Sequence, residues 1–492
     1  MTPTEIRTLP EAFEARLRAE LGQDTAMRML EALRMAPPAT PAVRLNRRKG
    51  ALPGPDLCPE PVSWSGDCGF RLRTERPVFA FDPAWQAGLY YVQDASSMAI
   101  SAVVRELVGK HFDPSAALRY LDACAAPGGK TIAAIDALPE GSIVVANEFD
   151  RRRAGILVEN LEKWGYPAVA ASCGDTAAFR KLPASFDIIA VDAPCSGEGM
   201  MRKEPEAIAQ WSPGLVADCA ALQREILENT WEALKPGGFL IFSTCTFGRE
   251  ENEDNVARAE RALGARRIPL DCLKDAPGVL SHEPATYRFM PGFVDGEGLF
   301  IVVLHKPDDA PCGRPRPPKN HGKEKIDPAA SKLCASALGP RFAPVVMPDG
   351  SFSAIPAGDA SFFATLRAAL DLRLCGVPLG ATKGRDIVPA QGLALSAALR
   401  PEAFPIVGLS DPREAIAYLR GESLGHLPDG TPRGFVAPAW LGAPLGFVKN
   451  LGSRANNLFP AHLRLKTLPP EGWEPPRIVL NTSTTDPNSS QR

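Results

Sequence analysis

The sequence predicts an α/β fold built on an open sheet of mainly parallel strands with helices packed on it. Strand-like apolar runs alternate with helical segments from about residue 90 to residue 306, which is the pattern of repeated strand–helix–strand units. The first strand, at 120–123, and the helix expected near 130–138 are joined by a turn that contains two glycines. Glycine lets the backbone come close to a ligand at the start of a helix.

The length of 492 residues exceeds what one compact core accommodates, so further domains are expected on both sides of the sheet. An N-terminal α+β domain is predicted at 1–90, and it opens with a helix at 4–35 in which Phe13, Leu17 and Leu21 recur at helical spacing. A segment rich in Pro, Lys and Arg reads as a linker, and a Pro- and Gly-rich region of short elements follows it. The later boundaries are expected at 91–306 (core), 307–330 (linker), 331–400 (C-terminal α+β domain), 401–470 (last domain) and 471–492 (disordered tail).

Composition bounds the class of protein. The net charge of −2 gives no overall attraction to nucleic acid, so such a partner would have to meet local basic patches. The 11 cysteines are scattered without a C-x-x-C pair, which argues against a zinc site or a redox dithiol, and no metal is expected. The N-terminus lacks an apolar signal segment, and no uncharged apolar stretch is long enough to span a bilayer. A reduced, cytoplasmic protein without membrane contact is expected.

Polar side chains end three consecutive predicted strands. The glycine turn follows Asp122, Glu148 ends the second strand, and Asp175 follows the third. Each acid taken alone could be a helix N-cap or a solvated loop charge. The turn matches neither the dinucleotide fingerprint nor the phosphate loop. Three polar ends at one edge of a parallel sheet favour a nucleoside-bearing cofactor such as S-adenosylmethionine, with a carboxylate available to the ribose hydroxyls.

Two cysteines end the next two strands. Asp192 and Cys195 close one apolar run, and Cys245 closes another within Ser-Thr-Cys-Thr. Carboxyl ends of strands in an open sheet face the ligand crevice, so both thiols are expected at one site. Free cysteines are often only small buried hydrophobes. Here their flanking motifs favour covalent catalysis, because a thiolate is a strong nucleophile.

Five ordered motifs within about 40–306 carry a family resemblance. The motifs are Tyr91–Ser97, Ala126–Thr131, Asp192–Gly199, Ser243–Thr246 and Glu250–Glu253. Together they resemble the Nop/Sun family of RNA 5-methylcytosine methyltransferases. Within that family the chain is most similar to the bacterial branch that acts on small-subunit rRNA, whose C-terminal PUA-like end resembles the region with Tyr418–Glu422 and Gly446–Asn450.

The resemblance implies a Rossmann-like class I methyltransferase core, S-adenosylmethionine as cofactor, and a covalent route to methylation at C5 of cytosine. It implies that Cys245 attacks C6, that Cys195 helps to release the product, and that Asp192 hydrogen-bonds the cytosine edge. Glu148 is implied at the ribose and Asp175 at the adenine. The remaining cofactor contacts implied by the family are Cys124, Ala125, Ala126, Pro127, Gly128, Gly129, Lys130 and Asp192.

The implied partner is RNA: 16S rRNA or the small ribosomal subunit, with tRNA as the alternative, bound by a monomer. Phosphate contacts are expected from two basic groups, one near each end. The candidates are Arg44, Arg47, Arg48 and Lys49, and Lys449, Arg454, Arg464 and Lys466. Such runs can also be plain solvated faces. Glu198 departs from the small polar residue of many members, which puts the detailed shape of the base pocket in question.

Two rival functions are open. A DNA cytosine-C5 methyltransferase shares the Pro-Cys motif, but there that cysteine is itself the nucleophile, and the second cysteine would be surplus. A non-catalytic RNA-binding or ribosome-assembly factor with the same fold would be expected to have lost a thiol or a cofactor acid. Both cysteines and all three acids are present, so the enzyme is favoured.

Overall fold

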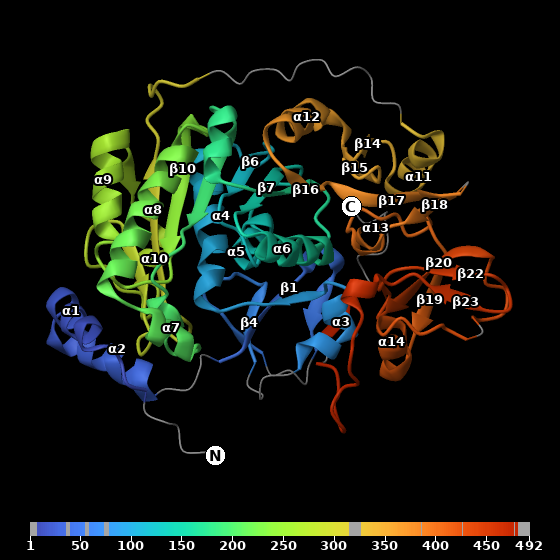
Figure 1. Ribbon diagram of the computed structural model, residues 1–492, viewed down its shortest axis with the longest axis horizontal. Helices are drawn as coiled ribbons and strands as arrows, with labels where there is room; N and C mark the ends of the chain where they lie inside the picture. The colour runs from blue at the N-terminus through green and yellow to red at the C-terminus, as the bar shows by residue number, and fades with distance from the viewer. Residues whose placement is uncertain are drawn as a thin grey trace, which may run out of the picture.

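The computed structural model is seen in Figure 1. It describes residues 7–35, 40–54, 59–72, 78–313, 326–384, 386–425, 427–476 and 478–480. The first residues of the helix predicted at 4–35, the middle of the predicted linker (314–325) and the end of the predicted tail (481–492) lie outside these ranges. Within them, no helix is long and apolar enough to cross a membrane.

A nine-stranded sheet forms the centre of the molecule, and the predicted α/β fold class is confirmed (Figure 1). Its main path runs β11-β13-β10-β9-β6-β7-β8-β16, and β12 pairs with β13 off this path. The strands from β10 to β8 are parallel, whereas β13 and β16 run antiparallel at the two sides. The bounds are β6 Arg119–Asp122, β7 Ile143–Glu148, β8 Val169–Cys173, β9 Phe186–Asp192, β10 Leu234–Thr244, β11 Arg266–Ile268, β12 Thr286–Phe289, β13 Leu299–His305 and β16 Leu372–Cys375.

Helices cover both faces of the sheet, and successive strand residues point to opposite faces. In β7, Val144 joins the cluster under one set of helices and Val145 joins the cluster on the other face. The first set is α4 Ala99–His111, α5 Gly129–Ile135, α6 Arg151–Trp164 and α10 Asp271–Lys274. The second is α8 Pro213–Trp231, α9 Glu253–Leu263 and α12 Ala360–Ala369.

In the sequence, residues 222–234 and the Lys-Pro-Gly-Gly that follows them read as a helix and its stop signal, and both boundaries of this prediction are wrong. The helix expected at 222–234 begins nine residues earlier, at Pro213, where the Ser212 hydroxyl caps it by accepting from the Leu215 N–H at 3.1 Å. The Lys-Pro-Gly-Gly stop signal at 235–238 lies inside β10 instead. Gly237 has φ 76° there, and the pairing of β10 with β9 shifts register between Leu234 and Phe239. The glycines therefore form an irregularity in a strand rather than a helix end.

The N-terminal region has two parts. The predicted helix 4–35 is a hairpin of α1 (Glu11–Leu21) and α2 (Gln23–Met35), broken at Gly22 with φ 78°. This hairpin packs against the core through Phe13, Trp211 and Phe247. The second part is a separate four-stranded sheet in the order β3-β4-β1-β5, and helix α3 lies between β4 and β5 in the chain. Its elements are β1 Ala42–Leu45, β3 Glu60–Pro61, β4 Gly69–Arg71, α3 Pro83–Gln86 and β5 Tyr90–Val92.

The segment between the core and the last domain is joined to the core sheet. Its strand β16 extends that sheet beyond β8, and Phe363 of α12 is buried in the cluster on one of the sheet's faces. The rest of it is a sheet in the order β14-β15-β17-β18 with two helices. The bounds are α11 Pro328–Leu338, β14 Phe342–Val346, β15 Phe352–Pro356, β17 Val377–Lys383, β18 Asp386–Pro389 and α13 Gln391–Leu395.

The last domain lies at the opposite end of the molecule from the α1–α2 hairpin (Figure 1). It shares a core with the small N-terminal sheet, where Leu45 and Tyr418 belong to one cluster. Residues 478–480 form strand β24, which pairs with β2 (Ala51–Pro53), so the prediction of a disordered tail is wrong for these three residues. The other elements are β19 Ile406–Leu409, α14 Pro412–Leu419, β20 Gly434–Trp440, β21 Ala443–Pro444, β22 Val448–Asn450 and β23 Ala455–Asn457.

Candidate active site

The two cysteines meet at the carboxyl ends of the parallel strands of the sheet. Strands β9 and β10 are neighbours and run parallel, so the loops after them lie side by side. The Sγ atoms of Cys195 and Cys245 are 2.9 Å apart, and both side chains are half-buried. The hydrogen bond with Cys245 and burial raise the pKa of the Cys195 thiol well above its usual range. Cys195 is therefore held as a thiol that can donate to Cys245.

Asp192 lies beside the thiols at the end of β9 and is held from two sides. Its Oδ2 accepts from Lys130 Nζ at 2.7 Å, and its Oδ1 accepts from Ser243 Oγ at 2.8 Å. Burial works to lower the pKa of Lys130, but the charge of Asp192 and its hydrogen bond outweigh this and raise it. An ion pair that is only partly exposed therefore faces the site.

The glycine turn joins β6 to α5 directly beside this ion pair. Gly128 precedes the helix with φ 112°, a conformation that favours glycine. Gln93 from the small N-terminal sheet donates to the Gly129 carbonyl at 2.9 Å. Asp122 is fully buried, accepts from Thr131 Oγ1 at 2.7 Å, and has its pKa raised to about 7 by burial. The turn is thus fixed from both sides.

Glu148 is buried at the end of β7 and holds the same turn. Its carboxylate accepts from the backbone N–H of Ala126 at 3.3 Å and of Asp150 at 3.0 Å. The next residue, Phe149, is 73% exposed. Single exposed apolar side chains are common on protein surfaces, but this ring lies directly after a buried carboxylate at the end of a strand. Sequence reasoning did not single out Phe149, although its place after the acidic strand end was visible.

Asp175 has the structural role that the sequence left open as its alternative. It caps the short helix η5 (Thr176–Lys181), where its Oδ1 accepts from the Ala177 N–H at 2.7 Å. The side chain is exposed after β8, the strand that follows β7 in the sheet. The cap uses one carboxylate oxygen, so the other can still accept from a ligand.

Glu198 is buried behind the cysteine loop. It accepts from Trp211 Nε1 and from the Phe247 N–H, each at 2.9 Å, and it pairs with Arg16 of α1. The departure from the family pattern therefore ties the loop after Cys195 to the N-terminal hairpin.

Two of the N-terminal basic candidates do not fit phosphate contacts. Arg44 is fully buried and donates to Gln93, Asp136 and Ser101 at 2.9, 3.0 and 3.1 Å. The ammonium group of Lys49 donates to the carbonyls of Ala87 and Lys163, and burial lowers its pKa to about 7. The prediction of a phosphate-binding role is wrong for Arg44, because strand β1 points it into the interior.

The C-terminal basic candidates are more open. Arg454, Arg464 and Lys466 are exposed. Lys449 pairs with Asp386 at 3.2 Å, and Arg464 Nε donates to the Phe459 carbonyl at 3.4 Å. Arg454 and Lys466 are therefore the better candidates for phosphate contacts in this region.

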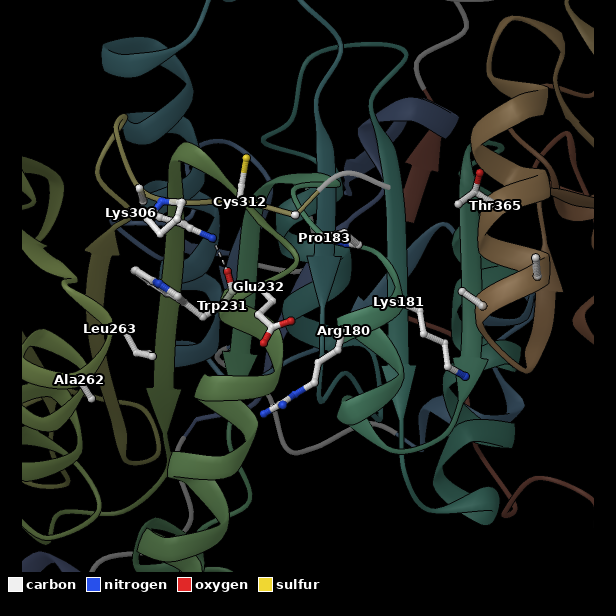
Figure 2. A pocket seen from close by; sticks show the side chains of 15 residues that line it. Arg180, Lys181, Pro183, Trp231, Glu232, Ala262, Leu263, Lys306, Cys312 and Thr365 are labelled. Carbon is white, nitrogen blue, oxygen red and sulfur yellow. Dashed lines mark hydrogen bonds between the residues drawn. The ribbon is translucent and has the colours of Figure 1, made fainter. Parts of the chain in front are cut away.

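A cavity of about 1040 Å³ lies elsewhere, at the amino ends of the parallel strands (Figure 2). Pro183 and Glu232 line it just before β9 and β10 begin. Lys306 donates to the carbonyls of Trp231 and Leu234 at 2.7 and 2.8 Å. The cysteines lie at the other ends of these strands, the carboxyl ends, so this cavity is not the candidate active site.

The fold and the site define a class I methyltransferase core, which a separate C-terminal domain follows. The family described as "16S rRNA methyltransferase RsmB/F" matches residues 110–305, and the "Methyltransferase RsmF PUA domain" matches residues 405–465. The chain belongs to this RsmB/F family of 16S rRNA methyltransferases. The expected PUA-like C-terminal region is confirmed by the second match.

Relatives and solved structures agree with this membership. Ribosomal RNA small subunit methyltransferase F of Escherichia coli O157:H7 is 31% identical, over 77% of this chain and 78% of its own length. The protein of that name from Shewanella loihica is 29% identical, over 82% and 83%. The crystal structure of NSun6 from Pyrococcus horikoshii is similar with a TM-score of 0.50 and 19% identity, over 60% of this chain and 98% of that one. That likeness shows the shared fold.

Proposed function

We propose that this chain transfers a methyl group from S-adenosylmethionine to C5 of a cytosine in small-subunit ribosomal RNA, through a covalent bond from Cys245 to C6. The observation that carries the proposal is the pair of thiols 2.9 Å apart beside an Asp–Lys ion pair. Radiolabelled methyl transfer to purified 16S rRNA, with 23S rRNA and tRNA as competing substrates, tests it. Labelling of tRNA alone would contradict the proposed substrate.

The two cysteines would divide the work. Cytosine C5 is a weak nucleophile, and attack of the Cys245 thiolate at C6 makes C5 enamine-like and able to accept a methyl group. The two sulfur atoms share a hydrogen bond, and the raised pKa of Cys195 makes it the donor toward Cys245 Sγ. Release requires the C5 proton to leave to solvent, so that the C5=C6 double bond forms again while the S–C6 bond breaks and its electron pair returns to Cys245 Sγ. A hydrogen-bond donor at that sulfur stabilises the returning negative charge. Cys195 would therefore assist the release of the product.

Asp192 would hold the cytosine edge. Lys130 and Ser243 both donate to its carboxylate, so it is presented as a hydrogen-bond acceptor for the exocyclic amine at N4. The target base has to leave its stack to reach this position, which costs a few kcal/mol and less in a loop.

The residues at the ends of β6, β7 and β8 fit S-adenosylmethionine, which when bound supplies an electrophilic methyl group. Phe149 offers an uncovered ring to an adenine face, and the free oxygen of Asp175 can accept from its amine. The buried Glu148 would accept from the ribose hydroxyls. The turn from Cys124 to Lys130 would line the methionine part, where Gly128 allows close approach.

Glu148→Ala is expected to weaken S-adenosylmethionine binding by about 1–3 kcal/mol, because hydrogen bonds to a charged acceptor are lost in a buried site. The variant also loses the bond to the Ala126 N–H, so thermal unfolding should be measured alongside calorimetry. Glu159→Ala serves as the control, because it removes a glutamate from α6, the helix that follows β7 in the chain. Wild-type affinity in a folded Glu148→Ala protein would remove this residue from the cofactor site.

The double variant Arg454→Ala/Lys466→Ala is expected to bind rRNA with a shallower salt dependence. Each phosphate contact that is lost lowers the slope of log K against log salt by about 0.7 for single-stranded nucleic acid. Arg261→Ala/Arg266→Ala removes the same charge from α9 and β11, far from the last domain (Figure 1). Equal slopes for the two double variants would rule out this phosphate contact.

A further inference from the structure

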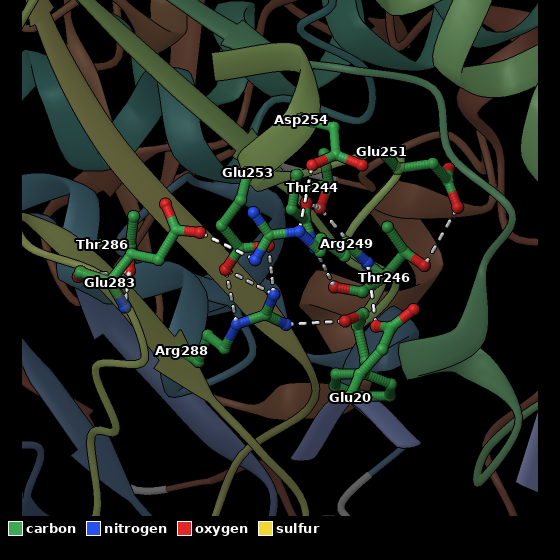
Figure 3. A network of polar contacts seen from close by, with 12 residues as sticks. Glu20, Thr244, Thr246, Arg249, Glu251, Glu253, Asp254, Glu283, Thr286 and Arg288 are labelled. Atoms are coloured by element: carbon green, nitrogen blue, oxygen red, sulfur yellow. Dashed lines mark hydrogen bonds and ion pairs between the residues drawn. The ribbon is translucent and has the colours of Figure 1, made fainter. Parts of the chain in front are cut away.

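Glu251 lies directly behind both cysteine loops. Its side chain is fully buried and accepts from the Ser196 N–H at 2.9 Å and from Ser196 Oγ at 2.6 Å. The same carboxylate accepts from Thr246 Oγ1 at 3.2 Å, and Figure 3 shows this bond. Ser196 follows Cys195 and Thr246 follows Cys245, so one carboxylate bridges the neighbours of the two thiols.

Gln223 of α8 adds to this clamp, by which we mean the hydrogen bonds of Glu251 to Ser196 and Thr246. Its Nε2 donates to Glu251 at 3.2 Å and to the Pro194 carbonyl at 2.9 Å. Asn255 Nδ2 donates to Gln223 Oε1 at 2.8 Å and so fixes the amide orientation. Gln223 thus holds Pro194 and Glu251 holds Ser196, so the residues on both sides of Cys195 are bound to two buried side chains that are hydrogen-bonded to each other.

Glu251 also differs from the buried acids around it in its hydrogen-bond partners, which are neutral groups and not cations. Glu198 pairs with Arg16, and Glu253 pairs with Arg288 at 2.5 Å. Among the residues that the structure describes, no cationic group lies within 4.0 Å of Glu251, which is held by neutral donors. Burial raises the pKa of Glu251, and the hydrogen bonds from Ser196 and Thr246 oppose this shift. In its charged form the carboxylate acts strongly on its neighbours. It adds to the hydrogen bond with Cys245 and to burial, which raise the pKa of Cys195.

We propose that Glu251 is a positioning residue for methyl transfer: it locks the two loops so that the thiols stay in contact, and its charge keeps Cys195 a donor toward Cys245. The proposal deepens the function proposed above and rests on it. It adds a residue that touches neither the cytosine nor the cofactor and acts through Ser196 and Thr246.

The test compares three variants of the full chain. Glu251→Gln keeps the shape and removes the charge, Glu251→Ala removes the clamp, and Glu250→Gln removes a charge from the exposed neighbouring residue as the control. Single-turnover methyl transfer to 16S rRNA is measured together with the affinities for S-adenosylmethionine and RNA. Alkylation of Cys195 by iodoacetamide is followed by mass spectrometry as a function of pH, because the thiolate is the reacting form.

Methyl transfer is expected to fall about a hundredfold in Glu251→Ala and about tenfold in Glu251→Gln, since small misplacements of reacting groups are this costly. Both affinities should stay at the wild-type value. The alkylation midpoint of Cys195 should move to lower pH in Glu251→Gln and not in Glu250→Gln. The hydrogen bond with Cys245 and burial still raise its pKa there, but the contribution of the Glu251 charge is gone.

A wild-type rate and an unshifted midpoint in Glu251→Gln would overturn the proposal, and this variant decides the matter if Glu251→Ala does not fold. Failure of the wild-type protein to methylate any rRNA would instead overturn the proposed function. The alkylation midpoint needs no RNA, so it separates the two failures.

Discussion

Cys245→Ala is expected to lose methylation below detection and to form no covalent bond with RNA, whereas Cys195→Ala is expected to accumulate protein trapped on its substrate. The first variant lacks the nucleophile that must attack C6. The second keeps attack and methyl transfer but lacks the S–H group that lies 2.9 Å from the sulfur that has to leave. A denaturing gel with labelled 16S rRNA and S-adenosylmethionine shows the trapped species as a band shifted by the mass of the RNA.

The double variant Cys195→Ala/Cys245→Ala is the matched control, and it should trap nothing. Cys219→Ala removes a half-buried thiol from α8, outside the two loops, and should behave as the wild type. A trapped band from Cys245→Ala would mean that the two cysteines have exchanged roles, as in the DNA type of enzyme. Full activity of both single variants would end the covalent account.

Arg44→Ala is expected to destabilise the protein by about 3–5 kcal/mol, which is the usual cost of breaking a buried ion pair by removing one partner. Asp136 would be left buried without its cation, since Arg44 donates to it at 3.0 Å. Urea unfolding at pH 8 measures this loss. Arg454→Ala, at an exposed position, is the control and should change stability little.

The deficit of Arg44→Ala should shrink in acid. Burial already raises the pKa of Asp136 while Arg44 opposes this, so the variant should raise that pKa further. An acid whose pKa is higher in the folded state costs stability above its unfolded pKa, and the cost disappears once both states are protonated. Equal deficits at pH 4 and pH 8 would show that lost packing, and not the orphaned charge, is responsible.

The sequence allowed the core sheet and the strand-end positions of the candidate site residues to be predicted because both depend on local signals. Apolar runs ending in Asp192, Cys195 and Cys245 place those residues at strand ends whatever the rest of the chain does. The neighbouring positions of β9 and β10 then bring the thiols together. The helix N-cap at Asp175 was likewise among the alternatives that its position offered.

The features that could not be predicted from the sequence depend on packing between segments that are far apart in the chain. Arg44 sits in a run of basic residues, yet the pairing of β1 between β4 and β5 turns it inward. Strand β16 comes from a region that reads as a separate domain, and it joins the core sheet across nearly two hundred residues of chain. Glu251 belongs to the Glu250–Glu253 motif of the family resemblance, but its role could not be predicted because it arises from loops that only the fold brings together.

The position of β16 also limits how the chain can be divided. A protein truncated after about residue 306 would lose an edge strand of the core sheet and Phe363 of α12 from the cluster on one of its faces. Such a truncation would expose apolar surface, so its loss of activity would not report on RNA binding. Substitutions of exposed basic residues in the last domain address that question without this damage.

The most direct measurement is bisulfite sequencing of 16S rRNA from cells that lack this gene, complemented with the wild-type protein or with Cys245→Ala. Methylation at C5 protects cytosine from conversion. The account predicts at least one cytosine in 16S rRNA that becomes convertible on deletion, is protected again by the wild-type protein, and stays convertible with Cys245→Ala. An identical pattern in all three strains, or protection restored by Cys245→Ala, would contradict it.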